Sequence, residues 1–156
     1  MTSGNASPGA EPVPLIRDRF RVTMGDTDAA QVIYFGAPTR WAERLMTTWL
    51  ADVKFPTSEL LASGYGLPAV RAELTYHKPL RLDDQVEATL WLQRKSARSV
   101  TWRAEFAHPG DSTPAVRVLL TQVYARLEGG RPVPTPWPDA LTDLFGEEVP
   151  EAPSSG

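Results

Sequence analysis

The chain of 156 residues has no cysteine and only two histidines. The absence of cysteine excludes disulfide bonds and thiolate nucleophiles, and two histidines disfavour a histidine-rich zinc site. No apolar run approaches the roughly 18 residues that a membrane-spanning helix needs, and the first residues have neither the basic nor the apolar segment of a signal peptide. We therefore expect a soluble cytoplasmic protein with no metal site and no membrane partner.

The chain also lacks a concentration of positive charge. Its formal net charge is -3, and its lysines and arginines are scattered, so nucleic acid is not expected as a partner. Residues 1–13 and 146–156 are rich in Pro, Gly, Ser, Ala and Glu, which predicts disordered tails around one domain at 14–145. A domain of this size has little room for a bulky substrate, which favours an oligomer with its site at a subunit interface.

Hydrophobic periodicity predicts one strand followed by a long helix. Residues 16–24 alternate between apolar and polar side chains, as in a half-buried strand. A helical period begins near Pro38, which suits the first turn of a helix. The wide apolar face of this helix carries Trp41, Ala42, Leu45, Met46, Trp49 and Leu50. A face of this width is expected to be covered by a sheet.

Four further strands are predicted beyond a loop at 55–66. The loop is expected to hold one helical turn capped by Thr57 or Ser58. The predicted strands are 70–77, 86–93, 100–106 and 115–127. Turn residues separate them, so consecutive strands are expected to pair antiparallel, and the apolar run 118–120 indicates a central strand or one buried against a partner. The result is an α+β fold in which a curved antiparallel sheet of about five strands wraps one long helix.

The strongest functional signal is a pair of acids just ahead of the helix. The segment GDTDAAQVIYF, residues 25–35, contains Asp26 and Asp28. The first N–H groups of a helix have no intrahelical acceptor, and the helix dipole favours an oxygen that becomes negative. A carboxylate beside such donors suits acyl transfer.

This segment, with the helical RWAER at 40–44, resembles the signature of the 4-hydroxybenzoyl-CoA thioesterase family of hotdog-fold acyl-CoA thioesterases. The resemblance continues at YHKPL (76–80), DDQV (83–86) and RKS (94–96), and it covers most of the predicted domain. It implies a hotdog fold, hydrolysis of an acyl-CoA with an aryl or medium-chain acyl group, and a homodimer or homotetramer with shared sites. It implies no cofactor, because coenzyme A is part of the substrate.

The resemblance assigns roles to individual residues. The second acid of the family's Asp-x-Asp triplet is catalytic and corresponds to Asp28, either as a nucleophile that forms a mixed anhydride or as a base that activates water. The family's oxyanion hole uses main-chain N–H groups at the helix entry, which correspond to Tyr34, Phe35 and Gly36, with Phe35 the best match. Asp26 is interpreted as structural.

Three further residues near this motif are candidates for the site. Gln31 stands where the family usually has glycine, which predicts a different loop path or a side chain that projects into the site. Glu43 is the rival catalytic carboxylate, because a second hotdog type places its acid on this helix, and its structural interpretation is a pair with Arg40 or Thr47. Thr39 is interpreted as a helix cap, with contact to the substrate carbonyl as the alternative.

A compact basic turn is the candidate for binding coenzyme A. Arg94, Lys95, Ser96 and Arg98 are suited to contact phosphates, although an ordinary charged hairpin is an equal alternative. The tryptophans at 41, 49, 91 and 102 lie at periodic positions, which favours core packing over a role in an acyl pocket.

Two other functions stay open. The same fold releases polyketide or fatty acyl chains from an acyl carrier protein, and the basic turn favours coenzyme A only weakly over such a partner. A non-catalytic acyl-binding module is the second alternative, with Gln31 as the mark of a lost reaction. A hydratase is disfavoured, because its arrangement of Asp and His is not found downstream of Asp28.

Overall fold

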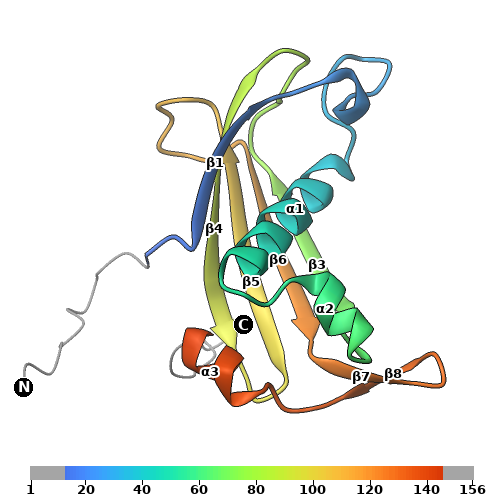
Figure 1. Ribbon diagram of the computed structural model, residues 1–156. Coiled ribbons are helices and arrows are strands. Elements are labelled where there is room, and N and C mark those ends of the chain that lie inside the picture. Colours follow the sequence, from blue (N-terminus) through green and yellow to red (C-terminus); the bar gives the residue numbers. More distant parts are fainter. Residues whose placement is uncertain (1–12, 146–156) are drawn as a thin grey trace, which may run out of the picture.

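The computed structural model describes residues 13–145, so the tails predicted at 1–13 and 146–156 lie outside the described residues except for Val13. Its main feature is a curved five-stranded antiparallel sheet around one long helix (Figure 1). In spatial order the sheet contains β1 (Ile16–Arg21), β4 (Gln85–Lys95), β5 (Ser99–Ala107), β6 (Val116–Val123) and β3 (Ala69–Tyr76). The helix is α1 (Ala37–Asp52). The predicted α+β class and five-stranded sheet are confirmed.

Smaller elements surround this unit. A short 3-10 helix, η1 (Met24–Asp26), follows β1, and α2 (Thr57–Ala62) follows α1. A second sheet contains β2 (Tyr65–Gly66), β7 (Ala125–Glu128) and β8 (Arg131–Pro134), and α3 (Asp139–Phe145) ends the described chain. None of the described helices is long and apolar enough to cross a membrane.

The pairing of the strands departs from the prediction at one point. β4, β5 and β6 are consecutive antiparallel neighbours as predicted, but β3 pairs with β6 rather than with β4. The segment after β3 does not form a hairpin, because the His77 N–H bonds to the Ala115 carbonyl oxygen and the Asp84 carbonyl oxygen accepts the Val22 N–H. β3 therefore lies at the edge of the sheet, beside the helix entry.

The last predicted strand is divided in two. At Tyr124 the chain leaves the main sheet, since its N–H donates to the Arg98 carbonyl oxygen and its own carbonyl accepts from Thr135. Beyond it, β7 and β8 form a hairpin around Gly129 and Gly130, both with positive φ, a conformation typical of tight two-residue turns. The run 118–120 lies in β6, an internal strand with alternate side chains buried.

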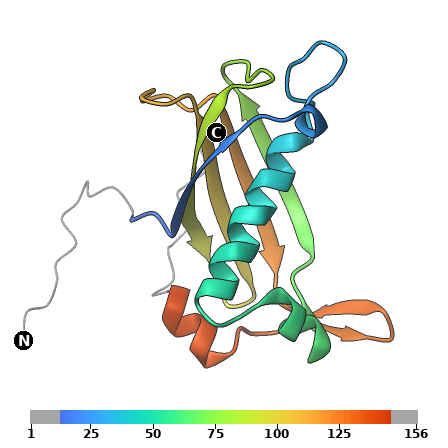
Figure 2. The same ribbon diagram turned by 45° about the horizontal axis from the view of Figure 1, so that its top comes forward.

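The helix lies across the inner face of the sheet (Figure 2). It packs onto this face through its buried aromatic side chains. The Trp41 ring contacts Phe106 edge-on at 5.2 Å, and Trp49 contacts Trp102 at 5.7 Å. The core positions predicted for these three tryptophans are confirmed. Trp91 is the exception, because it lies partly exposed on the outer face under the Arg103 guanidinium, 4.3 Å from the ring centre.

The expected cap of α2 is wrong. Pro56 occupies the N-cap position, with φ -62° and ψ 136°, and among the described residues no side chain caps this helix. Proline fixes φ near -65° and so sets the extended conformation of an N-cap without a side-chain acceptor. Thr57 lies inside the helix instead, and its Oγ1 is buried without a partner among the described residues.

Candidate active site

The acidic segment forms a tight hairpin between η1 and α1. The Asp28 N–H donates to the Val32 carbonyl oxygen at 3.0 Å, and the Gln31 N–H donates to the Asp28 carbonyl oxygen at 2.9 Å. Gln31 has φ 62°, in the left-handed region that glycine enters most readily, and its side chain is exposed. Gln31 therefore adopts a conformation that is typical of glycine, and the different loop path stays a prediction.

The two acids of this segment have different surroundings. Asp26 accepts through Oδ1 from the Trp41 indole N–H at 3.1 Å and through Oδ2 from the Thr23 N–H at 2.9 Å. It fixes the loop to the helix, as the structural interpretation expects. Asp28 is exposed, and its Oδ1 accepts the Ala30 N–H at 2.8 Å. Within the described chain its Oδ2 accepts no hydrogen bond, so one carboxylate oxygen is available to a substrate or to water.

Two of the three expected oxyanion donors are available. The Tyr34 N–H donates to the Asp26 carbonyl oxygen at 3.0 Å, which leaves it unsuited to a substrate. The N–H groups of Phe35 and Gly36 donate to no other part of the described chain. Gly36 is the N-cap residue of α1, so both groups lie at the positive end of the helix dipole. The candidate hole therefore consists of the Phe35 and Gly36 amides.

The carbonyl group of the peptide between Phe35 and Gly36 accepts a hydrogen bond from the edge strand β3. The Tyr76 hydroxyl, from the last residue of β3, donates to the Phe35 carbonyl oxygen. Partial burial raises the pKa of this hydroxyl above its usual value, so it stays protonated and donating at neutral pH. The Phe35 ring projects outward and is 83% exposed.

The structure contradicts the expected cap by Thr39 and contains one of the two pairs expected for Glu43. Thr39 does not cap α1, because Gly36 occupies the N-cap position and no side chain of the described residues caps there. The Thr47 hydroxyl donates to Glu43 Oε1 at 2.8 Å, whereas Arg40 reaches the Tyr34 hydroxyl at 3.4 Å. Of the two partners considered for Glu43, the structure has Thr47.

Glu43 and Thr47 line an apolar groove beside α1. The groove has a volume of about 400 Å³, and its other walls include Met46, Leu61, Leu67, Pro68, Gln122 and Leu127. Glu43 follows Gly36 by seven residues, two turns along the same face of the helix, or about 10.5 Å at 1.5 Å per residue. Asp28 is not among the lining residues of this groove.

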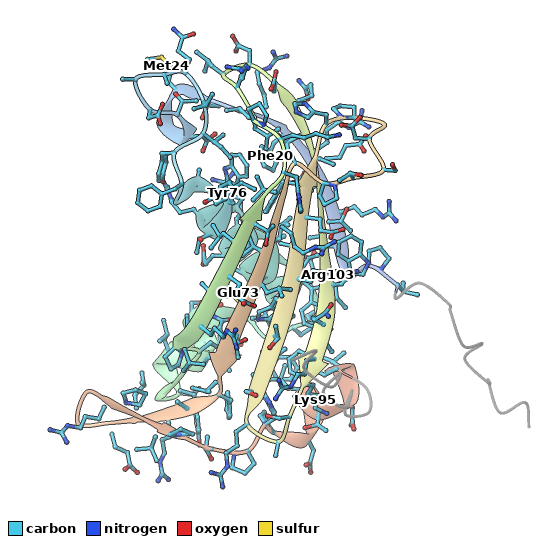
Figure 3. All side chains as sticks on the ribbon, turned by 180° about the vertical axis from the view of Figure 1, so that it is seen from behind. Phe20, Met24, Glu73, Tyr76, Lys95 and Arg103 are labelled. Carbon is cyan, nitrogen blue, oxygen red and sulfur yellow. The ribbon has the colours of Figure 1, made fainter. Side chains whose placement is uncertain are left out.

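The basic turn is not near the acidic loop within one chain. Figure 3 shows Lys95 at one end of the sheet and Met24, at the start of the acidic loop, at the other. The β4 strand between these ends has 11 residues, a span of about 36 Å. Lys95 is only 6% exposed, and the Ser96 hydroxyl is engaged with Ser99 Oγ at 2.6 Å. Arg98 is the most exposed of the four predicted residues.

The position of Tyr76 beside the helix entry was not predicted from the sequence. Its only signal was the match at 76–80, which indicated a strand and a turn and gave no reason to connect that strand to the helix entry. The described residues contain no cluster of three or more His, Cys, Asp or Glu side chains that could hold a metal ion.

Comparison with known proteins agrees with this architecture. Residues 22–145 match the model of the Thioesterase-like superfamily. A curated 1,4-dihydroxy-2-naphthoyl-CoA hydrolase from Synechocystis sp. is 24% identical over 127 residues, which cover 80% of this chain and 92% of that protein.

Two solved structures are also similar. A gentisyl-coenzyme A thioesterase has a TM-score of 0.72 at 25% identity, over 81% of this chain and 98% of that one. A 1,4-dihydroxy-2-naphthoyl-CoA thioesterase from Synechocystis has a TM-score of 0.74 at 20% identity, over 83% of this chain and 93% of that one. The narrower 4-hydroxybenzoyl-CoA family stays a prediction. The chain has the hotdog fold and belongs to the Thioesterase-like superfamily.

Proposed function

We propose that this thioester hydrolase cleaves the coenzyme A thioester of an aryl acid, with Asp28 as the catalytic carboxylate. The observation that carries the proposal is that one Asp28 oxygen and two main-chain N–H groups at the start of α1 have no hydrogen-bond partner among the described residues. Asp26, two residues earlier, has both oxygens engaged and is unsuited to the same role.

In the proposed reaction the thioester carbonyl oxygen accepts hydrogen bonds from the Phe35 and Gly36 amides. Attack on the carbonyl carbon gives a tetrahedral oxyanion that these donors and the helix dipole stabilise. With Asp28 as nucleophile, the carbon–sulfur bond breaks to leave a mixed anhydride, which water hydrolyses. With Asp28 as base, water attacks directly and Asp28 takes its proton. Either route consumes one water and releases the acid and the thiol of coenzyme A.

The groove beside α1 supports an aryl acyl group. It is mainly apolar, and about 400 Å³ accommodates one or two fused rings. A rigid ring system that begins at the Gly36 amide would extend along α1 toward Glu43, whose second carboxylate oxygen can accept from a ring hydroxyl. The named substrates of the similar proteins, 1,4-dihydroxy-2-naphthoyl-CoA and gentisyl-coenzyme A, both carry a hydroxylated ring.

The proposal includes a homodimer as the smallest active unit. The outer edge of β3 is unpaired among the described residues, and Val70 on this strand is 61% exposed. Antiparallel pairing of two β3 strands places the basic-turn end of one chain beside the acidic-loop end of the other. In this arrangement the Arg94–Arg98 turn of one chain would lie near Asp28 of the other chain. Within a single chain the two lie at opposite ends of the sheet.

The test is release of thiol from a panel of aryl, short-chain and long-chain acyl-CoAs, by wild type, Asp28→Asn and Glu43→Gln. We expect the highest kcat/KM with aryl substrates and a loss of about 10³-fold or more in kcat for Asp28→Asn. Full activity of Asp28→Asn together with inactive Glu43→Gln would assign catalysis to Glu43.

Two further arms separate the alternatives. Faster turnover of an acyl carrier protein thioester than of the matching acyl-CoA would favour release of a carrier-bound chain. Binding of acyl-CoA by wild type without release of thiol would indicate a non-catalytic module.

A further inference from the structure

The peptide between Phe35 and Gly36 is the middle peptide of a β-turn. The Ala37 N–H donates to the Tyr34 carbonyl oxygen at 3.0 Å, which closes the turn over residues 34–37. Gly36, the third residue of this turn, has φ -87° and ψ -12°, the values of a type I turn. In a type II turn the same residue has φ near +80°, a value that glycine adopts without steric cost.

Types I and II differ by a rotation of the middle peptide, which reverses the directions of its C=O and N–H groups. No peptide bond in residues 13–145 is cis, so the Phe35 carbonyl and the Gly36 N–H point in opposite directions. In the type I turn the Gly36 N–H is unengaged. In the type II turn the Phe35 carbonyl oxygen would take the place of that N–H, where it would repel a developing oxyanion.

The hydrogen bonds made by the residues on either side of this peptide are compatible with both turn types. The Tyr34 N–H bonds to Asp26 and the Ala37 N–H bonds to Tyr34, but both bonds lie outside the middle peptide and are compatible with either type. Within the described chain, the Tyr76 hydroxyl is the group that bonds to the middle peptide itself. It holds the Phe35 carbonyl away from the site.

We propose that Tyr76 is a positioning residue that keeps the Phe35–Gly36 peptide in its type I orientation and thereby aims the Gly36 N–H at the oxyanion. The inference rests on the proposed function, since it assumes that these amides form the oxyanion hole. A hydrogen bond to the carbonyl of an amide also polarises the N–H of the same amide, which strengthens it as a donor. Tyr76 therefore links the edge strand β3 to the chemistry at the helix entry.

The kinetic test compares Tyr76→Phe with wild type on the best acyl-CoA substrate. We expect kcat to fall about 10- to 100-fold, less than or equal to the loss of a whole oxyanion donor, with KM changed by less than about threefold. Tyr65→Phe is the matched control, because Tyr65 lies on β2, its ring stacks on Tyr124 with centroids 5.2 Å apart, and among the described residues its hydroxyl has no hydrogen bond to the turn. A kcat within about threefold of wild type for Tyr76→Phe would overturn the inference.

A double-mutant cycle with Gly36→Ala separates positioning from general stability. Alanine resists the positive φ of a type II turn, although its Cβ would lie 3.0 Å from the edge of the Tyr34 ring and require that ring to shift. If Tyr76 acts by preventing the rotation, its loss should reduce kcat by less than about threefold when residue 36 is alanine. Equal losses in both backgrounds would contradict the inference.

The turn type can also be measured without an activity assay, by nuclear Overhauser effects between protons of Phe35 and Gly36. In a type I turn the amide protons of Phe35 and Gly36 are close, whereas in a type II turn the Phe35 Hα lies close to the Gly36 amide proton. Nuclear Overhauser effects in labelled wild type should show the first contact, and Tyr76→Phe should show the second. Retention of the first pattern alone in Tyr76→Phe overturns the inference. Absence of acyl-CoA hydrolysis by wild type overturns the proposed function and the oxyanion role that rests on it, but not the control of the turn type by Tyr76.

Discussion

The two acids of the Asp-x-Asp motif should separate stability from catalysis. Asp26 accepts from Trp41 and Thr23, whereas the Asp28 carboxylate accepts only the Ala30 N–H among the described residues. We therefore expect Asp26→Ala to destabilise the fold and to affect activity mainly through that loss. Asp28→Ala should abolish turnover and leave stability almost unchanged.

The expected loss of stability depends on which hydrogen-bond donors each substitution leaves without an acceptor. Asp26→Ala removes the charged acceptor of the partly buried Trp41 indole N–H, at a cost of about 1.5–3 kcal/mol. It also removes the acceptor for the N–H and hydroxyl of Thr23, about 1 kcal/mol more. The sum is about 2.5–4 kcal/mol, or a fall in Tm of roughly 8–15 °C. Asp28→Ala loses one exposed hydrogen bond, under about 1 kcal/mol.

The assay is urea unfolding followed by tryptophan fluorescence, with kcat measured on the same preparations. Trp41 lies beside Asp26, so the transition reports on the affected region. Asp26→Asn is a useful intermediate, because it keeps one acceptor oxygen and should lose less stability than Asp26→Ala. The reasoning is refuted if Asp28→Ala destabilises the protein as much as Asp26→Ala, or if Asp28→Ala retains turnover.

Three other outcomes are expected. Gln31→Gly should raise the free energy of unfolding by up to about 1 kcal/mol, because glycine relieves the left-handed strain at φ 62°. The gain is limited because glycine is more flexible in the unfolded chain, and a urea midpoint below that of wild type would contradict the prediction. Gln122→Met should lower the free energy of unfolding by about 2–3 kcal/mol in the same assay, because the buried Trp102 indole N–H loses the acceptor that lies 2.8 Å from it. An unchanged urea midpoint would contradict this prediction. Mixing Asp28→Asn with Arg98→Ala, each impaired alone, should regain part of the wild-type rate if sites are shared between subunits, and no regain would argue for sites within one chain.

The sequence predicted the parts of the fold that depend on local periodicity. The helix at α1 is evident because Trp41, Leu45 and Trp49 recur on one face, and alternation identified four of the strands at nearly their observed bounds. The β3–β6 pairing was missed because it joins residues such as Leu74 and Val118, far apart in sequence, and no local signal specifies such a contact. The small second sheet was missed because its strands are too short to show a period.

The site was predictable in its residue types and less so in its geometry. The motif indicated Asp28 and the helix entry, and the roles of these residues stay proposals. It did not indicate that the Tyr34 N–H is taken by Asp26, or that Lys95 is buried. The first fact depends on the exact path of one short loop, for which the motif gives no dihedral angles. The second depends on how segments far apart in sequence pack, which the sequence does not encode locally. The contribution of Tyr76 was hidden for the same reason, since it reaches the turn across the sheet edge.

Several features that break local rules lie close together at the helix entry. Gln31 has positive φ, Phe35 exposes a large apolar ring, and the Phe35 and Gly36 amides have no acceptor in the described chain. Natural sequences satisfy such groups in most places and leave exceptions where another molecule completes the structure. A thioester oxygen would satisfy the two amides, and a second chain on the β3 edge would cover the Phe35 ring. In the proposed homodimer, the helix entry would therefore be half of a shared site.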